Sequence, residues 1–179
     1  MIHRAKKLLS LLLICCILQQ VLPMGAIVLA GGVEEQDWTG YTPISTKEDL
    51  DAIRNNLSGK YYLTNDIIFS EEDFAEGGNF YNSGAGWEPI GMVSVSAFTG
   101  IFDGNGHIVS GLYIDINSLS AVYTGLFGYN KGTIHNLGIR ESSITVSSKG
   151  ENIYVGGITG VNDGGEISSC SNSNGRERL

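Results

Sequence analysis

The hydrophobic and polar positions between Thr99 and Asn174 follow one short pattern three times. The copies are TGIFDGNGHIVSGLYI (99–114), TGLFGYNKGTIHNLGI (124–139) and GGITGVNDGGEISSCS (156–171). Their leading glycines are Gly100, Gly125 and Gly157, so the pattern recurs every few tens of residues. Such periods are typical of solenoid proteins, in which each repeat is one small structural unit.

Aligning the copies places apolar side chains in three columns. The columns hold nine residues: Ile101, Leu126 and Ile158; Ile108, Ile134 and Ile167; Leu112, Leu137 and Cys170. Equivalent side chains of stacked coils can cover one another, whereas one coil alone cannot bury its apolar face. The turns DGNG, GYNKG and GVNDGG separate the first two columns and contain residues that tolerate positive φ. The pattern predicts an all-β fold, a right-handed parallel β-helix or β-solenoid, with these nine residues in its core.

A helical pattern precedes the repeats. Ser45 and Glu48 fit a capping box, in which the serine accepts a hydrogen bond from the first turn and the glutamate reaches back. The apolar residues that follow stand at helical spacing: Leu50, Ile53 and Leu57. This spacing predicts a short amphipathic helix over 46–56, and we expect it to cover the open end of the first coil.

The rest of the chain divides by composition. The run 61–69 is rich in aromatic and β-branched residues, which favour strands, and the acidic, glycine-rich run 70–86 predicts a loop. The predicted organisation is a signal peptide (1–30), a flexible lead (31–40), a capping helix with the first coil (41–69), an acidic loop and connecting coil (70–97), solenoid repeats (98–174) and an unstructured tail (175–179).

Two of the copies carry a resemblance to a known family. The segments TGLFGYNKGTIHNLGI and VGGITGVNDGGEISSCSNS resemble the GLUG motif, a repeat of bacterial secreted and cell-surface proteins that include adhesins and immunoglobulin-A-cleaving metallopeptidases. The runs YTPISTKEDLDAIRNNLSGKYYLTNDI, GWEPIG and FTGIFDGNGHIVSGLYI resemble the segment that precedes such repeats. The resemblance covers about 41–174. It implies a solenoid in a surface protein, but it implies no single activity, because this repeat accompanies unrelated functions.

The first thirty residues predict export. Basic residues within 4–7 precede the apolar run 8–18, and small residues at 28–30 precede Gly31. This order is typical of a secretory signal peptide. The alternative is a retained membrane anchor, because apolar residues continue after the glutamines at 19 and 20. We expect cleavage before Gly31, no membrane insertion of the mature chain, and a secreted or cell-surface location.

The charge of the mature chain restricts its partners. Cleavage leaves 8 basic residues against 19 acidic ones, so nucleic acid and anionic membrane surfaces would repel the protein. Cys170 is the one cysteine left of 3, and no intramolecular disulfide can form. We expect Cys170 to be a buried thiol that reacts slowly.

The sequence offers few groups for catalysis. Four carboxylates could line the solenoid: Asp66, Asp103, Asp115 and Asp163. Acidic pairs are found on the grooves of β-helical polysaccharide enzymes, but Asp103 and Asp163 occupy turn positions that suit local backbone bonding. The DGNG turn lacks the alternating oxygens of a calcium loop, the chain has no H-E-x-x-H zinc motif, and His107 and His135 are expected to face outward. We expect no catalytic residue, no metal and no cofactor.

Aromatic residues are the remaining functional signal. Five of them flank the acidic loop: Trp38, Tyr41, Phe80, Tyr81 and Trp87. Aromatic faces edged with Asn and Asp suit carbohydrate, so Tyr81, Trp87 and Asp103 are the candidate binding residues. The alternative for Trp87 is packing over the end of the stack.

Two function classes stay open. We expect a noncatalytic surface module that acts as a spacer or binds a glycan or a host or matrix protein. The alternative is a piece of an enzyme, either the N-terminal region of a metallopeptidase or a polysaccharide-acting β-helix. Because the pattern fails after Asn174, we also expect the chain to be a fragment of a longer array.

Overall fold

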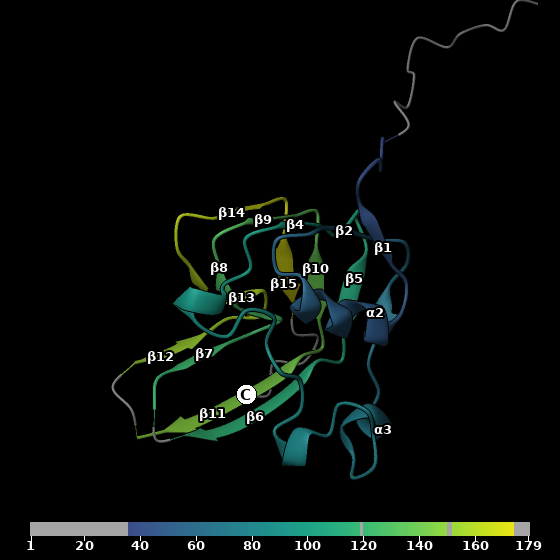
Figure 1. The fold of residues 1–179 in the computed structure, drawn as a ribbon. Helices are drawn as coiled ribbons and strands as arrows, with labels where there is room; N and C mark the ends of the chain where they lie inside the picture. Colours follow the sequence, from purple (N-terminus) through teal and green to yellow (C-terminus); the bar gives the residue numbers. More distant parts are fainter. Residues whose placement is uncertain (1–35, 119, 150–151, 174–179) are drawn as a thin grey trace, which may run out of the picture. The chain divides into compact units, whose positions relative to one another are not determined.

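The structure is a computed structural model that describes residues 36–118, 120–149 and 152–173. The chain divides into two compact units, 1–38 and 39–179. The first unit is described only over 36–38, so the expected signal peptide lies outside the described residues, as do positions 31–35 of the lead and the tail 175–179. All helices and strands below belong to the second unit (Figure 1).

Short strands dominate the second unit. The α-helices are α2 (Lys47–Ala52) and α3 (Glu71–Phe74), and the 3-10 helices are η1 (Ile53–Asn55), η2 (Asn82–Gly84) and η3 (Ser94–Ser96). The strands are β1 (Thr42–Ile44), β2 (Lys60–Leu63), β3 (Ile67–Ile68), β4 (Ile101–Asp103), β5 (Ile108–Ser110), β6 (Tyr113–Ser118), β7 (Val122–Thr124), β8 (Phe127–Asn130), β9 (Thr133–His135), β10 (Gly138–Arg140), β11 (Ser143–Ser148), β12 (Ile153–Val155), β13 (Thr159–Asn162), β14 (Glu166–Ser168) and β15 (Ser171–Ser173).

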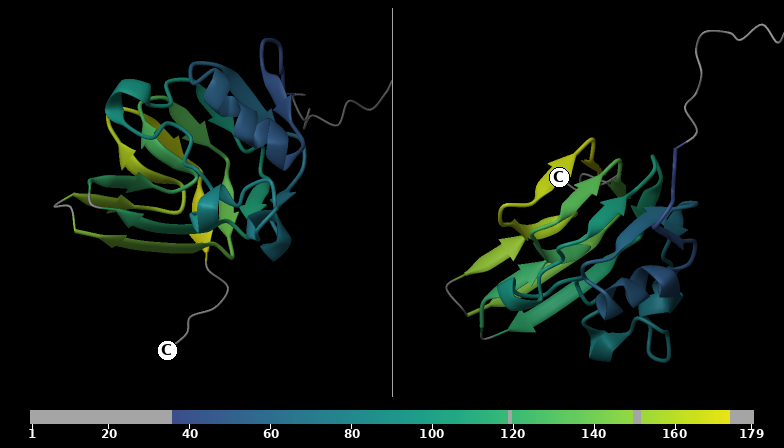
Figure 2. Two further views of the ribbon diagram at one scale, coloured as in Figure 1. Left: turned by 60° about the horizontal axis from the view of Figure 1, so that its bottom comes forward. Right: turned by 45° about the horizontal axis from the view of Figure 1, so that its top comes forward.

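Successive passes of the chain pair in parallel. We define four passes as 45–68, 69–110, 111–140 and 141–173; each gives one strand to a sheet of order β1-β2-β4-β9-β14 and one to a sheet of order β15-β10-β5-β3. The third and fourth passes also pair through β6–β11, β7–β12 and β8–β13. The sequence colours change in order from blue to yellow across these strands in Figure 2. The prediction of an all-β fold with parallel strands is confirmed.

The predicted alignment is right for the last two copies and wrong for the first. Ile134 lies opposite Ile167, as the columns require. In the first copy, however, Phe102 lies opposite Ile134, whereas Ile108 lies opposite Gly138. The repeat therefore steps from Phe102 to Ile134 and from Ile134 to Ile167, and the two steps are nearly equal in length.

The DGNG turn causes the misalignment. The pattern matches it with GYNKG, but in the structure it joins β4 to β5, at the level of the shorter turn that joins β9 to β10. Asn105, Asn136 and Ser169 mark the equivalent turns, with φ of 50°, 54° and 51°. The leading glycine of the first copy is displaced in the same way. A Cβ on Gly132 would lie 2.2 Å from the carbonyl oxygen of Gly100, so Gly100 packs against Gly132, which is not the leading glycine of the second copy.

This shift changes the core. Four of the nine predicted core residues are fully buried: Leu112, Leu126, Ile134 and Leu137. Ile158, Ile167 and Cys170 are only partly buried against that core. Ile101 and Ile108 are half-exposed, and their neighbours Phe102 and Val109 point inward instead, because strand residues alternate between faces.

The capping box is present one residue later than predicted. Thr46, not Ser45, is the N-cap of α2, and Asp49, not Glu48, completes the box. Asp49 Oδ2 accepts hydrogen bonds from the backbone N–H groups of Ser45 and Thr46, both at 3.0 Å. Leu50 and Ile53 are fully buried, so α2 and η1 pack against the core. No helix of the described residues is long and apolar enough to cross a membrane.

The acidic run 70–86 is more than the predicted loop. It begins with α3, whose capping box joins Ser70 to Asp73, and it buries Phe74 and Phe80. The rings of Phe69, Phe80 and Trp87 contact one another at centroid distances of 5.3 to 5.8 Å. The insertion 70–97 therefore carries its own aromatic cluster, which joins the main core.

Candidate ligand-binding groove

A groove of about 710 Å³ lies between the insertion and the later passes. Its lining residues are Phe69, Ser70, Glu71, Phe74, Ala75, Tyr81, Gly84, Gly111, Leu112, Tyr113, Glu141 and Ser143. One wall thus comes from 69–84, and the other comes from the start of the third and fourth passes. The groove joins aromatic rings with carboxylates, which is a mixed lining suited to a polar ligand with apolar faces.

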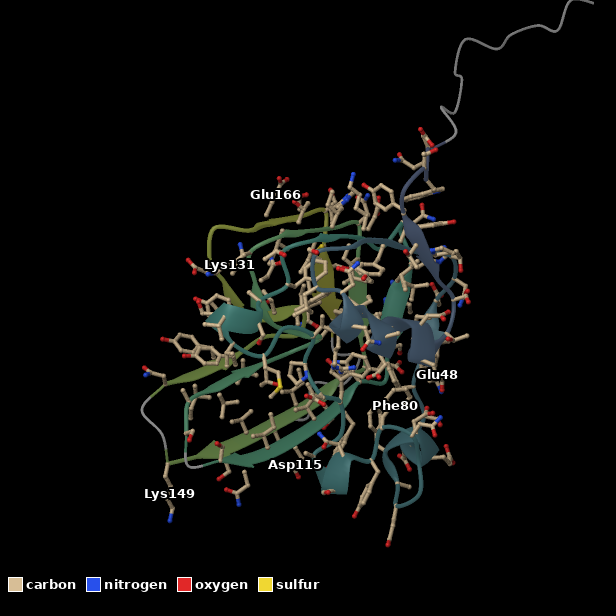
Figure 3. The ribbon with its side chains drawn as sticks, viewed as in Figure 1. Glu48, Phe80, Asp115, Lys131, Lys149 and Glu166 are labelled. Carbon is tan, nitrogen blue, oxygen red and sulfur yellow. The ribbon has the colours of Figure 1, made fainter. Side chains whose placement is uncertain are left out.

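The insertion wall is fixed to β6 by backbone pairing. Trp87 N donates to Tyr113 O at 2.8 Å, and Asp115 N donates to Ala85 O at 2.9 Å. Lys47 on α2 also pairs with Asp73 on α3, with 2.5 Å between Nζ and Oδ2. Figure 3 shows Phe80 in the insertion and Asp115 on β6, the two segments that these bonds join. The groove is therefore built on a supported wall rather than on a free loop.

Tyr113 contributes a half-buried ring to the groove. Its ring lies 5.7 Å from that of Phe74, between centroids, and its hydroxyl donates to Asp115 Oδ2 at 3.4 Å. Partial burial, together with the nearby Asp115 carboxylate, raises the pKa of Tyr113. The phenol therefore stays protonated at neutral pH and remains a hydrogen-bond donor.

The charged lining residues are acidic. Glu71 at the start of α3 and Glu141 at the start of the fourth pass are both exposed. Beside them, the Ser70 hydroxyl lowers the pKa of Glu72, which keeps that carboxylate ionised. A negative rim repels anionic ligands and leaves neutral or cationic ones as the ligands that fit.

The three predicted binding residues have different positions. Tyr81 is half-buried and lines the groove. Trp87 is only 1% exposed; its Nε1 donates to Leu126 O at 3.1 Å, and the Arg54 guanidinium lies 4.4 Å from its ring centroid. Asp103 is 5% exposed and sits in the DGNG turn. Trp87 and Asp103 are both buried and neither lines the groove, and the position of Trp87 agrees with its alternative interpretation of packing.

The candidate catalytic carboxylates each serve a different local contact. Asp103 Oδ1 accepts from Asn105 N at 2.7 Å and Asn136 Nδ2 at 3.1 Å, so the carboxylate ties two turns together. Asp66 bonds to Ile108 N and His107, both at 3.1 Å. Asp163 accepts from Tyr129 OH at 3.0 Å, and Asp115 accepts from Tyr113.

The two histidines within the described residues are half-exposed, and each lies beside one carboxylate. His107 faces Asp66, and His135 Nε2 lies 3.6 Å from Asp103 Oδ2. Within the described ranges, no three His, Cys, Asp or Glu side chains form a group that could hold a metal ion. These contacts support turns rather than a shared reaction centre.

Sequence reasoning missed most of the lining residues. Tyr113, Phe74 and Glu141 line the groove, but none stands out in the repeat pattern. One signal for Tyr113 was present: it alternates with the buried Leu112 and Ile114, which requires its ring to leave the core. The position of Glu141 beside the insertion depends on the stacking of the fourth pass and has no local signal.

Two curated proteins are similar to this chain. Halomucin of Haloquadratum walsbyi is 34% identical over 142 residues, which cover 76% of this chain and 1% of halomucin. A protein of Evansella cellulosilytica described as a Gly-rich membrane protein is 36% identical over 125 residues, which cover 68% of this chain and 13% of that protein. The chain therefore spans a small part of both relatives. No protein-family profile and no solved structure gives a significant match, so the GLUG resemblance stays a prediction.

Proposed function

We propose that this chain is a noncatalytic module of a secreted or surface-displayed protein, in which the stacked passes act as a spacer and the groove binds a glycan. The observation that carries the proposal is the groove itself, which places Tyr81 and Tyr113 beside two exposed carboxylates. Its walls are tied to α2 and β6, so little ordering would be needed on binding.

We infer that the passes form a right-handed β-solenoid. Parallel strands of one sheet are joined by right-handed connections in about 98% of cases. The GLUG resemblance supports the same architecture. The names of the two relatives, a halomucin and a membrane protein, support a place at the cell surface.

The chemistry of the lining favours a neutral sugar. The C–H faces of a pyranose pack on tyrosine rings, and its hydroxyls donate to carboxylates such as those of Glu71 and Glu141. The same carboxylates would repel sulfated or uronic sugars. A host or matrix protein is the alternative partner, and its binding segment would have to be neutral or basic.

The separate roles of the carboxylates support a noncatalytic module. Glycoside hydrolysis needs two carboxyl groups on opposite sides of one bond, about 5 to 9.5 Å apart. Asp103 is buried in a turn, and Asp66 is occupied by Ile108 N and His107. Neither residue lines the groove, so these two aspartates cannot act on a ligand bound there; the carboxylates that do line it, Glu71 and Glu141, are tested by the assay for reducing ends below.

Calorimetric titration of the mature chain with neutral oligosaccharides tests the proposal. We expect at least one of a cello-, manno-, xylo- and chito-oligosaccharide panel to bind without being cleaved. Tyr81→Ala should weaken that binding roughly tenfold, which corresponds to about 1.4 kcal/mol of lost stacking. Glu71→Gln should also weaken binding of the neutral oligosaccharide, because a carboxylate acceptor is lost. The same variant should bind a uronic oligosaccharide better than the parent chain does, because one negative charge is gone.

Tyr154→Ala is the matched control, because Tyr154 is an exposed tyrosine on β12 that does not line the groove. Equal loss of affinity in both tyrosine variants, or no binding by any sugar of the panel, would contradict glycan binding at this groove. Steady release of reducing ends would show that the chain is an enzyme.

A further inference from the structure

The fourth pass offers one edge of every sheet to solvent. β14 and β15 are the terminal strands of the two larger sheets, and β11, β12 and β13 each have one partner strand among the described residues. The yellow end of the colour series lies at one side of the strand layers in Figure 2. Five strands of one pass therefore present their outer backbone groups together, which is the setting in which a further strand can be added.

The same face is apolar at the positions that the stack buries elsewhere. Leu126, Ile134 and Leu137 are fully buried in the third pass, whereas their counterparts in the fourth are only partly buried: Ile158, Ile167 and Cys170. Val122 is 5% exposed, but Ile153 opposite it is 44% exposed. Each counterpart lacks the cover that a neighbouring pass provides.

An asparagine ladder has an open last rung. Asn130 is buried, and its Nδ2 donates both to Gly132 O at 3.2 Å and to Asn162 Oδ1 at 2.7 Å. Asn162 lies opposite Asn130 in the β8–β13 pair. Its own Nδ2 donates to Gly165 O at 2.8 Å, which leaves one N–H of the amide for a further rung in the described structure.

A tyrosine ladder ends at the same face. Tyr123 and Tyr154 are opposite in the β7–β12 pair, with their rings stacked at 5.2 Å and 5°. Tyr154 is 42% exposed, so part of its ring is open to solvent among the described residues. A third aromatic ring at the same level would continue the stack.

We propose that the outer face of the fourth pass is a docking surface for one further parallel pass of the same polypeptide pattern. That pass carries an asparagine level with Asn162, an aromatic residue level with Tyr154, and apolar residues over Ile158 and Ile167. Continuity with an existing interface supports this occupant, because the third and fourth passes already meet through these contacts.

A second copy of the chain is a poorer occupant. Parallel stacking would require it to present an early pass, but the second pass has Phe98, not asparagine, beside Asn130. In the first pass, α2 and η1 occupy the segment between β1 and β2, before the two sheet strands. The second pass therefore has no asparagine to continue the asparagine ladder.

The test is a duplication. A copy of 141–173 is inserted between Ser173 and Asn174. The copy carries Cys170→Ala, so that the original Cys170 is the thiol whose alkylation is measured. We expect hydrogen exchange of β14 and β15, and alkylation of Cys170, to slow by about tenfold or more. A scrambled insert of the same composition is the control and should slow neither.

Two further variants separate the contributions. Asn162→Leu made only in the inserted copy should lose much of the added protection, because the third rung is gone. If the first insert fails to fold, a copy of 111–140 at the same site takes its place. Unchanged exchange with whichever insert folds, or a stable dimer of the parent chain that already protects β14, would overturn the proposal.

Discussion

Trp87→Phe is the substitution whose effect the structure defines most fully. The indole is 1% exposed, donates to Leu126 O at 3.1 Å and lies under the Arg54 guanidinium. The neighbouring rings of Phe69 and Phe80 lie 5.5 and 5.8 Å away. The residue therefore links the insertion, the first pass and the third pass at one point.

The expected loss has two parts. Removing the indole N–H costs about 1 kcal/mol, the net value of one buried hydrogen bond, and Leu126 O keeps its bond from Ile90 N. The smaller ring leaves a cavity, and together with the lost burial this costs about 1 to 2 kcal/mol. We expect the free energy of unfolding to fall by about 2 to 3 kcal/mol, with a melting temperature about 8 to 12 °C lower.

Urea unfolding followed by circular dichroism measures the change. In Trp38→Phe, Trp87 is the one remaining tryptophan of 2, and its emission should be blue-shifted and should move to the red on unfolding. A loss of less than about 0.5 kcal/mol in Trp87→Phe, or a solvent-like emission from Trp87 in the folded chain, would refute the conclusion that Trp87 is buried and stabilises the fold.

Three other results are expected. Burial raises the pKa of the Cys170 thiol, so iodoacetamide at pH 7.5 should alkylate it about tenfold more slowly in the folded chain than in urea. Hydrogen bonds from Ser45 N and Ile108 N lower the pKa of Asp49 and Asp66, respectively. The stability that the two ionised carboxylates contribute is therefore complete above the ordinary pKa of 3.8 and is lost as the pH falls through the lowered pKa values. The double variant Asp49→Asn with Asp66→Asn should make the free energy of unfolding depend less on pH in acid. N-terminal sequencing of the secreted chain should begin at Gly31.

The parallel stacking could be predicted because the last two copies have the same length between their apolar positions. Ile134 and Ile167 align in the sequence and pair in the structure. The alignment of the first copy is wrong because its turn, DGNG, resembles in composition a turn that comes earlier in the other copies. Composition identifies a turn, but only the strand register shows which turn of the next pass it faces.

The groove could be predicted only in part. Tyr81 was accessible to sequence reasoning because it stands beside a loop that departs from the repeat. Trp87 has the same sequence context, but it is buried, which agrees with the alternative interpretation of packing, and its backbone N–H donates to Tyr113 O. A contact between segments so far apart along the chain has no local signal in the sequence. Glu141 likewise lines the groove only because the fourth pass pairs with the third.

The pairing of β1 with β2 has a consequence for the order of folding. Thr42 lies opposite Tyr61, so this parallel pair closes a short loop, whereas Tyr61 and Phe102 close a loop that is about twice as long. Each doubling of loop length adds about 0.6 kcal/mol to the entropy cost of closure. The first pair is therefore the least costly to close, and its loop contains α2 with its own capping box. A chain that leaves the ribosome or a membrane channel N-terminus first would have this nucleus available before the later passes emerge, and each new pass could then add to an edge that already exists.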